Sequence, residues 1–196
     1  MQVKSTVELW SGTFGDKYLQ RCRVDWQARM PFWESAIHFC TPATVFEFGC
    51  NAGWNLRAIS AVAPNIDLFG CDVNEQAVNE ARAAGFEVQK VSEHGVAGLY
   101  EPGTMDLVFS AGVLIHVAPQ DLERTMRNLI ELSGRYVLAV EYAADEEQEI
   151  EYRGLAGALW KRPYGRLYEG LGLRLLSEGE AGGFDQCNYW LLEKTA

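Results

Sequence analysis

The chain has 196 residues, of which 48% are hydrophobic, so it is long enough to bury the core of one globular domain. Its formal net charge of −10 argues against a protein that binds nucleic-acid phosphates, because that affinity comes from clustered lysine and arginine. The sequence has no run of about 18 apolar residues that could span a membrane, and its first ten residues lack the apolar segment of a signal peptide.

The five cysteines are odd in number, scattered along the chain and free of any C-x-x-C pair. This pattern indicates reduced thiols rather than a disulfide framework or a zinc site. We therefore expect a single-domain cytoplasmic protein, monomeric or homodimeric, with no metal, no nucleic acid and no membrane among its partners.

Residues 1–40 differ in character from the rest and are expected to form an N-terminal helical lid. The stretch 10–18 mixes aromatic residues with turn formers, and a helix is predicted through residues 32–39. Aromatic, basic and glycine residues ahead of the first core strand suit a lid that closes over a bound ligand. The alternative is that the aromatic side chains cover one face of a sheet, which stays open for Trp26, Phe32 and Trp33.

The next segment is typical of a strand, a tight turn and a helix. Residues 45–48 are mostly apolar, with a β-branched residue and two aromatic residues. Gly49 and Gly53 allow the backbone to turn sharply, and helical spacing resumes over residues 55–63. In open α/β sheets, a first βα turn of this kind binds nucleotide-like ligands.

The turn lacks the dinucleotide pattern G-x-G-x-x-G, since Asn51 stands at the middle glycine and Trp54 at the third. Asn51 tolerates a left-handed backbone, but an indole at the close-packing position argues against a pyrophosphate and therefore against NAD. Two acidic residues flank the turn: Glu47 lies two positions before the first glycine, and Asp72 ends the next predicted strand. They suit a ligand that carries an ammonium, a sulfonium and a ribose, and S-adenosylmethionine fits that description.

Asp72 ends the strand predicted over residues 66–73, at the carboxyl edge of the sheet, where it can accept hydrogen bonds from both ribose hydroxyls. The alternative is a role in a helix cap, because residues 75–84 are typical of a helix with Asn74 as its N-cap. The two roles are compatible.

Further strands and one helix complete the predicted sheet. An amphipathic helix begins at Pro119. The remaining strands are predicted over residues 86–91, 105–110 and 136–140, with a closing antiparallel pair over 173–176 and 187–193. Three candidates for catalysis lie at strand ends on the carboxyl edge, namely His116, Glu141 and Tyr142. His116 has apolar neighbours, so a purely structural histidine is an equal alternative.

From residue 143 the character of the chain changes again. An acidic run over residues 145–151 is typical of a solvated face. Aromatic and basic residues follow it: Tyr152, Arg153, Lys161 and Arg162. In an acidic protein this contrast indicates an acceptor site for an anionic or polar group, because arginine binds carboxylates in bidentate fashion. The alternative is internal ion pairing with the acidic run.

Several stretches, spread over nearly the whole chain, carry a family resemblance: residues 14–18 with Arg21, 46–56, 113–119, 141–142, 149–154, 159–162 and 190–194. They resemble class I S-adenosylmethionine-dependent methyltransferases, and more narrowly the pseudaminic acid biosynthesis-associated methylases. The resemblance implies one α/β Rossmann-like domain over residues 1–196, with a mostly parallel seven-stranded sheet and an antiparallel C-terminal strand pair. Its parts are a lid (1–40), a cofactor-binding core (41–142), and an acceptor-side helix with the closing strands (143–196).

The resemblance also assigns site residues. Those expected to bind the cofactor S-adenosylmethionine are Tyr18, Arg21, Glu47, Gly49, Asn51, Gly53, Asp72, Val73, Ser92, Glu93 and Ser110. Tyr18 and Arg21 are expected to reach the methionine carboxylate. Ser92 and Glu93 meet the adenine edge, and Ser110 leaves room beside the sulfonium. Phe14 joins Tyr152, Arg153, Lys161 and Arg162 on the substrate-binding side.

The resulting hypothesis is a methyltransferase that acts on a small polar or anionic metabolite, such as a sugar acid, an amino acid or a natural-product intermediate, and releases S-adenosylhomocysteine. One alternative is a cyclase that forms azetidine-2-carboxylate from the same cofactor and releases methylthioadenosine, which a tyrosine-bearing pocket would suit. A third is a non-catalytic cofactor-binding protein. The sequence departs from the family on the presumed acceptor side, at Cys22, at residues 143–145 and at Gln186.

Overall fold

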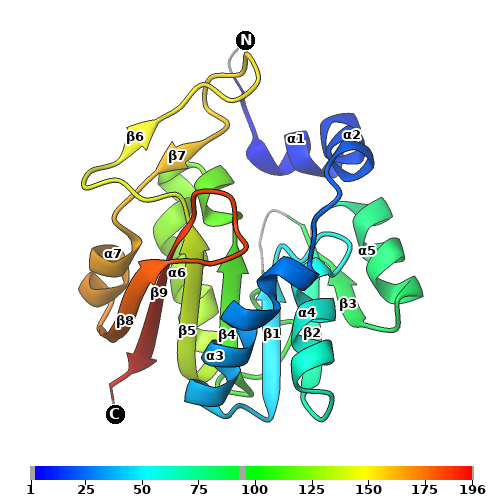
Figure 1. Ribbon diagram of the computed structural model, residues 1–196. Coiled ribbons are helices and arrows are strands. Elements are labelled where there is room, and N and C mark those ends of the chain that lie inside the picture. The colour runs from blue at the N-terminus through cyan, green and yellow to red at the C-terminus, as the bar shows by residue number, and fades with distance from the viewer. Residues whose placement is uncertain (1–2, 93–95, 196) are drawn as a thin grey trace.

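Seven strands form one sheet in the computed structural model, which describes residues 3–92 and 96–195 (Figure 1). In spatial order they are β3 (Glu87–Lys90), β2 (Asp67–Asp72), β1 (Thr44–Phe48), β4 (Met105–Ala111), β5 (Ser133–Glu141), β9 (Asn188–Lys194) and β8 (Leu173–Glu180). The first five are parallel, and β9 pairs in antiparallel fashion with β5 and β8. The predicted fold class is confirmed.

Helices cover both faces of the sheet. They are α3 (Met30–Cys40), α4 (Trp54–Val62) and α5 (Glu75–Ala83) on one face, and α6 (Pro119–Leu132) and α7 (Tyr164–Gly170) on the other. Successive side chains of a strand point to opposite faces. In β4, Leu107 and Phe109 therefore lie in the cluster with α3 and α4, while Val108 lies in the cluster with α6 and α7. Burial on both faces explains why the central strands are apolar runs.

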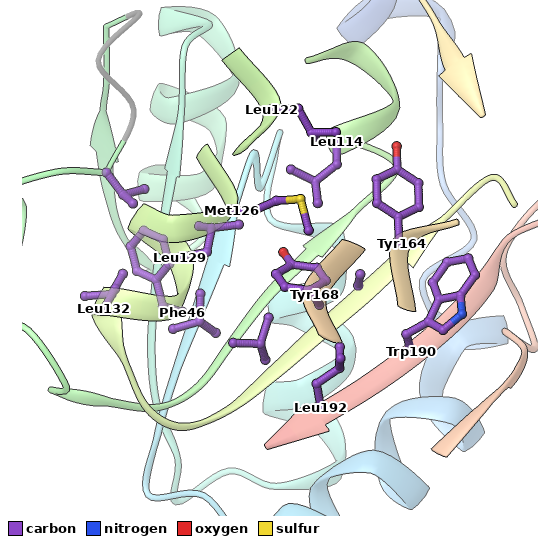
Figure 2. Close-up of a cluster of buried hydrophobic side chains, with 14 of the residues drawn as sticks. Phe46, Leu114, Leu122, Met126, Leu129, Leu132, Tyr164, Tyr168, Trp190 and Leu192 are labelled. Atoms are coloured by element: carbon purple, nitrogen blue, oxygen red, sulfur yellow. The ribbon is translucent and has the colours of Figure 1, made fainter. Parts of the chain in front are cut away.

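One half of the core lies between α6, α7 and the sheet (Figure 2). Leu122, Met126 and Leu129 recur at helical spacing along α6 and are buried against the sheet, as the predicted amphipathic helix requires. Tyr164 and Tyr168 of α7 complete this layer. Burying a side chain of leucine or methionine size contributes roughly 1.5 to 3 kcal/mol, so this layer anchors the strand ends that carry the site.

The lid consists of two short helices, α1 (Thr6–Ser11) and α2 (Thr13–Arg21), which lie above the carboxyl ends of the strands (Figure 1). Ser5 caps α1, and Gly12 separates the two helices. After the short turn η1 (Gln27–Arg29), α3 packs on the sheet, where Trp33 is fully buried 4.5 Å from the ring of Phe109. The lid is therefore shorter than residues 1–40, and Trp33 covers a sheet face.

The acceptor-side segment contains a two-stranded sheet that the sequence did not reveal. It pairs β6 (Gln148–Glu149) with β7 (Trp160–Lys161), so part of the acidic run is a strand rather than a loop. The short turn η2 (Leu114–His116) joins β4 to α6 beside it. Within the described ranges, every helix is too short or too polar to cross a membrane.

Candidate functional site

A cavity lies at the carboxyl ends of β1, β2 and β4 and is lined in part by residues of α1 and α2. Open α/β sheets bind ligands at this edge, because the ends of parallel strands meet there and leave a crevice. Lid residues, the Gly49 turn and the segment after β4 form its walls. Of the residues predicted from the sequence, the cavity brings together Tyr18, Glu47, Gly49, Asn51, Asp72, Val73 and His116.

The turn after β1 requires a left-handed backbone at several positions. Gly49 has φ +71°, and a Cβ built on it would lie 2.5 Å from a methyl group of Val113. Asn51 adopts φ +50°, which asparagine tolerates better than most residues. Gly53 has φ +76° and stands at the N-cap of α4, outside the cavity lining, where a Cβ would lie 3.0 Å from Phe86. The sequence spacing predicted this turn correctly.

Asp72 is fixed by backbone amides at the end of β2. Its Oδ2 accepts a hydrogen bond from the N–H of Asn51 at 2.8 Å, and its Oδ1 accepts one from the N–H of Asn74 at 2.8 Å. Burial raises the pKa of Asp72, and these amide bonds oppose that rise. Each carboxylate oxygen keeps a second lone pair, so the side chain remains able to accept further hydrogen bonds from a ligand in the cavity.

Asn74 connects Asp72 to the lid. Its side-chain Nδ2 donates to the carbonyl of Trp10 at 3.2 Å and to Oδ1 of Asp16 at 2.8 Å. Its Oδ1 accepts from the N–H of Ala77 at 3.0 Å, which confirms Asn74 as the N-cap of α5. The side chain of Asn74 therefore holds the lid and caps α5, and its backbone N–H donates to Asp72.

Behind the turn, the side chain of Asn55 bridges a buried carboxylate and a guanidinium. Asn55 donates from Nδ2 to Oε1 of Glu47 at 2.7 Å and accepts at Oδ1 from Nη1 of Arg29 at 2.8 Å. Glu47 is only 1% exposed, and burial raises its pKa to about 8. Its Oε2 and the Nε of Arg29 have no hydrogen-bond partner among the described residues. Unpaired buried polar atoms cost roughly 1 to 3 kcal/mol each, so this wall of the cavity favours a ligand with complementary polar groups.

An aromatic cluster forms the opposite wall, under the lid. The Trp10 ring lies edge-on to Phe14 and Tyr18, with centroids 5.3 and 5.1 Å apart. It also lies 4.4 Å from the ring of His116, which is 5.2 Å from Tyr152. Trp10, Tyr18 and His116 line the cavity, whereas Phe14 and Tyr152 lie outside its lining and contact these rings.

His116 uses one ring nitrogen for a contact within the protein. Its Nδ1 lies 2.6 Å from the carbonyl oxygen of Ala158. A carbonyl only accepts, so Nδ1 carries the proton and, in the neutral ring, Nε2 is an acceptor. Burial lowers the pKa of His116 to about 4. The ring is therefore neutral near pH 7 and presents an unprotonated nitrogen.

Glu141 and Ser110 lie beneath the cavity rather than in its lining. Glu141 is fully buried and accepts hydrogen bonds from Oγ of Ser110 at 2.8 Å and from three backbone N–H groups of residues 113–115. Burial raises the pKa of Glu141 to about 7, while these bonds lower it. Neither residue is placed to touch a ligand directly.

Arg162 requires a correction. It was expected to bind an acceptor, but its side chain is fully buried and all its donors serve the protein. Its Nε donates to Oε2 of Glu147 at 2.6 Å, and its Nη1 and Nη2 donate to the carbonyls of Leu114 and Val117 at 2.8 and 2.9 Å. Arg162 instead forms an ion pair with Glu147 of the acidic run, which was the alternative interpretation.

Other predicted residues also lie outside the cavity lining. Arg21 is exposed above the rings of Phe14 and Tyr18, and Arg153 is exposed beside Tyr152. The Nζ of Lys161 lies 5.9 Å from the ring centroid of Tyr142. Burial raises the pKa of Tyr142 to about 12, and its ring packs between the two large clusters. Ser92 is exposed, and Glu93 falls outside the described residues.

The polar and aromatic lining residues that the sequence did not predict include Trp10, Arg29 and Asn55. Asn55 stands eight positions after Glu47 in the first turn of a helix, and that spacing was an available signal. Arg29 and Trp10 reach the cavity through tertiary contacts, which no local pattern predicts. In the described part of the chain, no group of three or more histidine, cysteine or acidic side chains is arranged to hold a metal.

Comparison with protein families finds one match, in which residues 46–133 correspond to a methyltransferase domain. The match spans β1 to the start of β5, including the Gly49 turn, Asp72 and His116, and it indicates a transferase enzyme, as predicted. A search of curated protein sequences finds no significant match. The narrower resemblance to pseudaminic acid-associated methylases is not confirmed by these comparisons.

Solved structures share the fold of this chain over nearly its full length. Magnesium protoporphyrin IX methyltransferase from Synechocystis PCC 6803 with bound SAM is 14% identical, with a TM-score of 0.69 over 98% of this chain and 99% of that one. A SAM-dependent methyltransferase from Aquifex aeolicus is 17% identical, with a TM-score of 0.68 over 91% and 98%. Human N-acetylserotonin methyltransferase in complex with SAM is 14% identical, with a TM-score of 0.74 over 98% of this chain and 59% of that one.

Proposed function

We propose that this protein binds S-adenosylmethionine in this cavity and transfers its methyl group to a small molecule. The observation that supports the proposal is the set of polar atoms around the cavity. Glu47 and Arg29 leave a buried oxygen and a buried nitrogen unpaired on one wall, and Asp72 lies at the neighbouring strand end. These groups complement an amino acid and a ribose in one ligand.

Glu47 and Arg29 would hold the methionine end of that ligand. A carboxylate oxygen without a partner accepts from an ammonium, and a guanidinium nitrogen without a partner donates to a carboxylate. Asn55 bridges the two side chains and keeps them at a fixed separation. We assign the methionine carboxylate to Arg29 rather than to Arg21, because Arg21 is exposed and lies outside the cavity lining. Tyr18 lines the cavity and remains a proposed contact.

Asp72 would hold the ribose. Its side chain is oriented by two backbone amides and lines the cavity, with lone pairs left for two hydroxyl groups. Val73 follows it in the lining, and Ser92 lies beyond β3 at the same edge as a proposed contact to the adenine. Gly49 and Asn51 allow the backbone of the turn to approach the ligand closely.

The cofactor supplies an electrophilic methyl group on a sulfonium, so the protein has to align a nucleophile with it and exclude water. The aromatic wall excludes water, and aromatic rings near a cation contribute about 0.5 to 2 kcal/mol of attraction. His116 presents Nε2 to the cavity as a proton acceptor for an acceptor hydroxyl or amine. Tyr142 and Glu141 lie outside the lining, so we assign the role of base to His116 alone.

The acceptor is proposed to be a small molecule that packs against aromatic rings. Arg153 and Lys161 were expected to bind an anion, but they do not line the cavity. Arg162 forms its hydrogen bonds within the protein. Trp10 and Tyr18 form the wall beside His116 instead. We therefore favour a neutral or weakly charged ring or chain with an ionisable O–H or N–H group. A sugar acid or amino acid held by an arginine clamp fits these contacts less well.

Calorimetry with S-adenosylmethionine and S-adenosylhomocysteine tests the central claim. We expect saturable binding of both, with one site per chain. Failure to bind either compound would overturn the proposal. The matched variant is Glu47→Gln, which keeps the shape of the side chain and its hydrogen bond from Asn55 but removes the negative charge that faces the ligand ammonium.

Mass spectrometry of reaction products then separates transfer from the cyclase alternative. The protein is incubated with S-adenosylmethionine alone and with a panel of small hydroxylated and amino compounds. Turnover only in the presence of an acceptor, with S-adenosylhomocysteine as the product, is the expected result. Methylthioadenosine formed without an acceptor would instead show an intramolecular displacement.

A further inference from the structure

The turn that carries His116 is held by two buried charges. The turn η2 follows β4 and directs the His116 ring into the cavity lining. Glu141 and Arg162 are both fully buried, although burial of an ionised side chain is costly unless it is fully hydrogen-bonded. Both side chains form hydrogen bonds with the backbone of this turn, and each also bonds to one side chain beside it, Ser110 or Glu147.

Glu141 binds the amide side of the turn. Its Oε1 accepts from the N–H groups of Val113 at 3.3 Å and Leu114 at 3.1 Å, and its Oε2 accepts from the N–H of Ile115 at 3.4 Å. Ser110 donates a further bond to Oε1 at 2.8 Å. Three consecutive backbone amides of the segment that precedes His116 therefore converge on one carboxylate.

Arg162 binds the carbonyl side of the same turn. Its Nη1 donates to the carbonyl of Leu114 at 2.8 Å and its Nη2 donates to the carbonyl of Val117 at 2.9 Å. These two carbonyls flank His116 in the sequence. Its third nitrogen, Nε, donates to Glu147, whose side chain is 45% exposed.

The His116 ring itself is held by the chain that carries Arg162. The carbonyl of Ala158, four residues before Arg162, accepts from Nδ1 at 2.6 Å. The segment 158–162 contains β7, which pairs with β6. One short segment thus holds both the backbone of the turn and the proton of the imidazole ring.

We infer that Arg162 and Glu141 form a clamp that fixes the position and the tautomer of His116, so that Nε2 always faces the cavity as a proton acceptor. This inference rests on the proposed role of His116 in methyl transfer. Both clamp residues are positioning residues, since neither lines the cavity. A merely stabilising role does not require charges, because apolar side chains of similar size stabilise a core equally well or better.

Nuclear magnetic resonance of the imidazole nitrogens tests the clamp without a known acceptor. The chain has three histidines, so the ¹⁵N signals of uniformly labelled protein are few, and a His116→Gln variant identifies those of His116. In the wild-type protein we expect a single neutral tautomer with the proton on Nδ1 at pH 7. We expect protonation only near pH 4, in keeping with the lowered pKa of this buried ring.

The test variant is Arg162→Lys, because a lysine has one nitrogen in place of the two, Nη1 and Nη2, that the planar guanidinium aims at the two carbonyls. We expect a mixture of tautomers and a titration midpoint that moves up by one pH unit or more, toward the ordinary value of about 6.5 for histidine. Arg166→Lys on the exposed side of α7 is the matched control and should leave both quantities unchanged.

Neighbouring charges have to be accounted for in this titration. The groups that face the His116 ring are Tyr152 at 5.2 Å and, across the Trp10 ring, Tyr18. Tyr18 has a pKa raised by burial and stays neutral throughout the titration. Behind the turn lie Arg162 and Glu141, whose own pKa of about 7 makes it the competing titration. Glu141→Gln identifies any transition that belongs to Glu141.

The opposite outcome is equally clear. A folded Arg162→Lys protein with an unchanged tautomer and midpoint, and only a lower urea midpoint, would make Arg162 a stabilising residue and nothing more. Should Arg162→Lys fail to fold, Glu147→Gln decides the matter, because Glu147 is half exposed and supports Arg162 from outside. It should shift the tautomer ratio in the same direction, and an unchanged ratio would overturn the clamp.

Failure of the clamp and failure of the proposed function are separable. A locked Nδ1–H tautomer in a protein that binds no S-adenosylmethionine by calorimetry would leave the clamp intact and remove the methyltransferase proposal. Normal cofactor binding with a freely exchanging His116 tautomer in the wild-type protein would do the reverse.

Discussion

The two walls of the cavity are built in different ways. On the wall of β1 and β2, backbone amides of neighbouring turns converge on Asp72, and left-handed residues bring the chain close to the ligand position. On the wall of His116, side chains from α1, α2, η2 and the segment around β7 meet through ring contacts and buried charges. The first wall depends on backbone conformation, and the second depends on which side chains are present.

This difference separates what is common in the fold from what can vary. The first wall presents a few polar side chains, and backbone amides of the neighbouring turns hold the one at Asp72 in a fixed orientation. A wall made of side chains from distant elements changes shape with single substitutions. We therefore expect substitutions on the first wall to alter cofactor binding, and substitutions on the second to alter proton acceptance and acceptor choice.

The largest effect is expected from Gly49→Ala. A Cβ at this position combines a left-handed backbone with overlap at 2.5 Å on Val113, and together these cost roughly 2 to 4 kcal/mol. Urea unfolding should show that loss, and calorimetry should show no cofactor binding. Gly85→Ala is the matched control, since its φ is +95° but no described atom lies within 4 Å of the added Cβ. Equal losses in the two variants would mean that only backbone strain matters.

Asp72→Ala should have the next largest effect. Loss of a buried acceptor for the ribose hydroxyls should weaken cofactor binding by roughly 1 to 3 kcal/mol in calorimetry. Asp72→Asn keeps one oxygen and should fall between this variant and the wild type. Asp67→Asn, at the exposed start of the same strand, serves as the control. Unchanged affinity of Asp72→Ala would remove this residue from the proposed site.

Glu47 should give the pH dependence of the first wall. Its pKa is about 8 in the folded protein against an ordinary 4.5, so the unfolded chain loses this proton first and its contribution lowers stability as pH rises from about 4.5 to 8. A bound ammonium favours the carboxylate, so cofactor binding at pH 7 should release a proton. Calorimetry in buffers of different ionisation enthalpy measures that release.

Two variants check the assignment to Glu47. Glu47→Gln should abolish the proton release and make the fall of stability with pH shallower, with the contribution of Glu141 remaining, while Glu131→Gln at an exposed position of α6 should change neither. Proton release that persists in Glu47→Gln would have to come from another group.

The smallest effect is expected from Asn74→Ser, which changes the residue that connects Asp72 to the lid. Serine keeps an oxygen for the helix cap but loses the amide donor that holds the lid at Trp10 and Asp16. Each lost hydrogen bond is worth about 0.5 to 1.5 kcal/mol, so cofactor binding should weaken several-fold. Hydrogen exchange over residues 6–21 should accelerate, and exposed Asn65→Ser should change neither measurement. Unchanged exchange would show that the lid is held by its aromatic contacts alone.

Much of the first wall could be predicted from the sequence because its parts are close together along the chain. The Gly49 turn, Asp72 and the Asn74 cap follow from turn chemistry, strand patterning and capping rules, which act over a few residues. Asn55 was missed although its position eight residues after Glu47 placed it on the adjacent helix. The contact between Asn55 and Glu47 is therefore a local one in the sequence.

The second wall could not be predicted in the same way. Arg162 has the composition of an anion-binding residue, and only its complete burial and its bonds to Leu114 and Val117 give it another role. The role of α3 was open for a similar reason, because the same aromatic residues suit both a lid and a helix that covers a sheet. Residue type alone does not tell which side of the backbone becomes buried.

The sequence by itself determined the strands, the glycine turn after β1 and the acidic residue at the end of β2, because these depend on local backbone preferences and on hydrophobic periodicity. The arrangement of the sheet followed from the family resemblance. The tertiary structure alone decided that Asn55 links Arg29 to Glu47, that Trp10 lies against His116, and that Glu141 and Arg162 bind one turn. Arg29 and Glu47 are 18 positions apart in the sequence, and Trp10 and His116 are 106 positions apart. Only the packing of helices on both faces of the sheet brings such residues together.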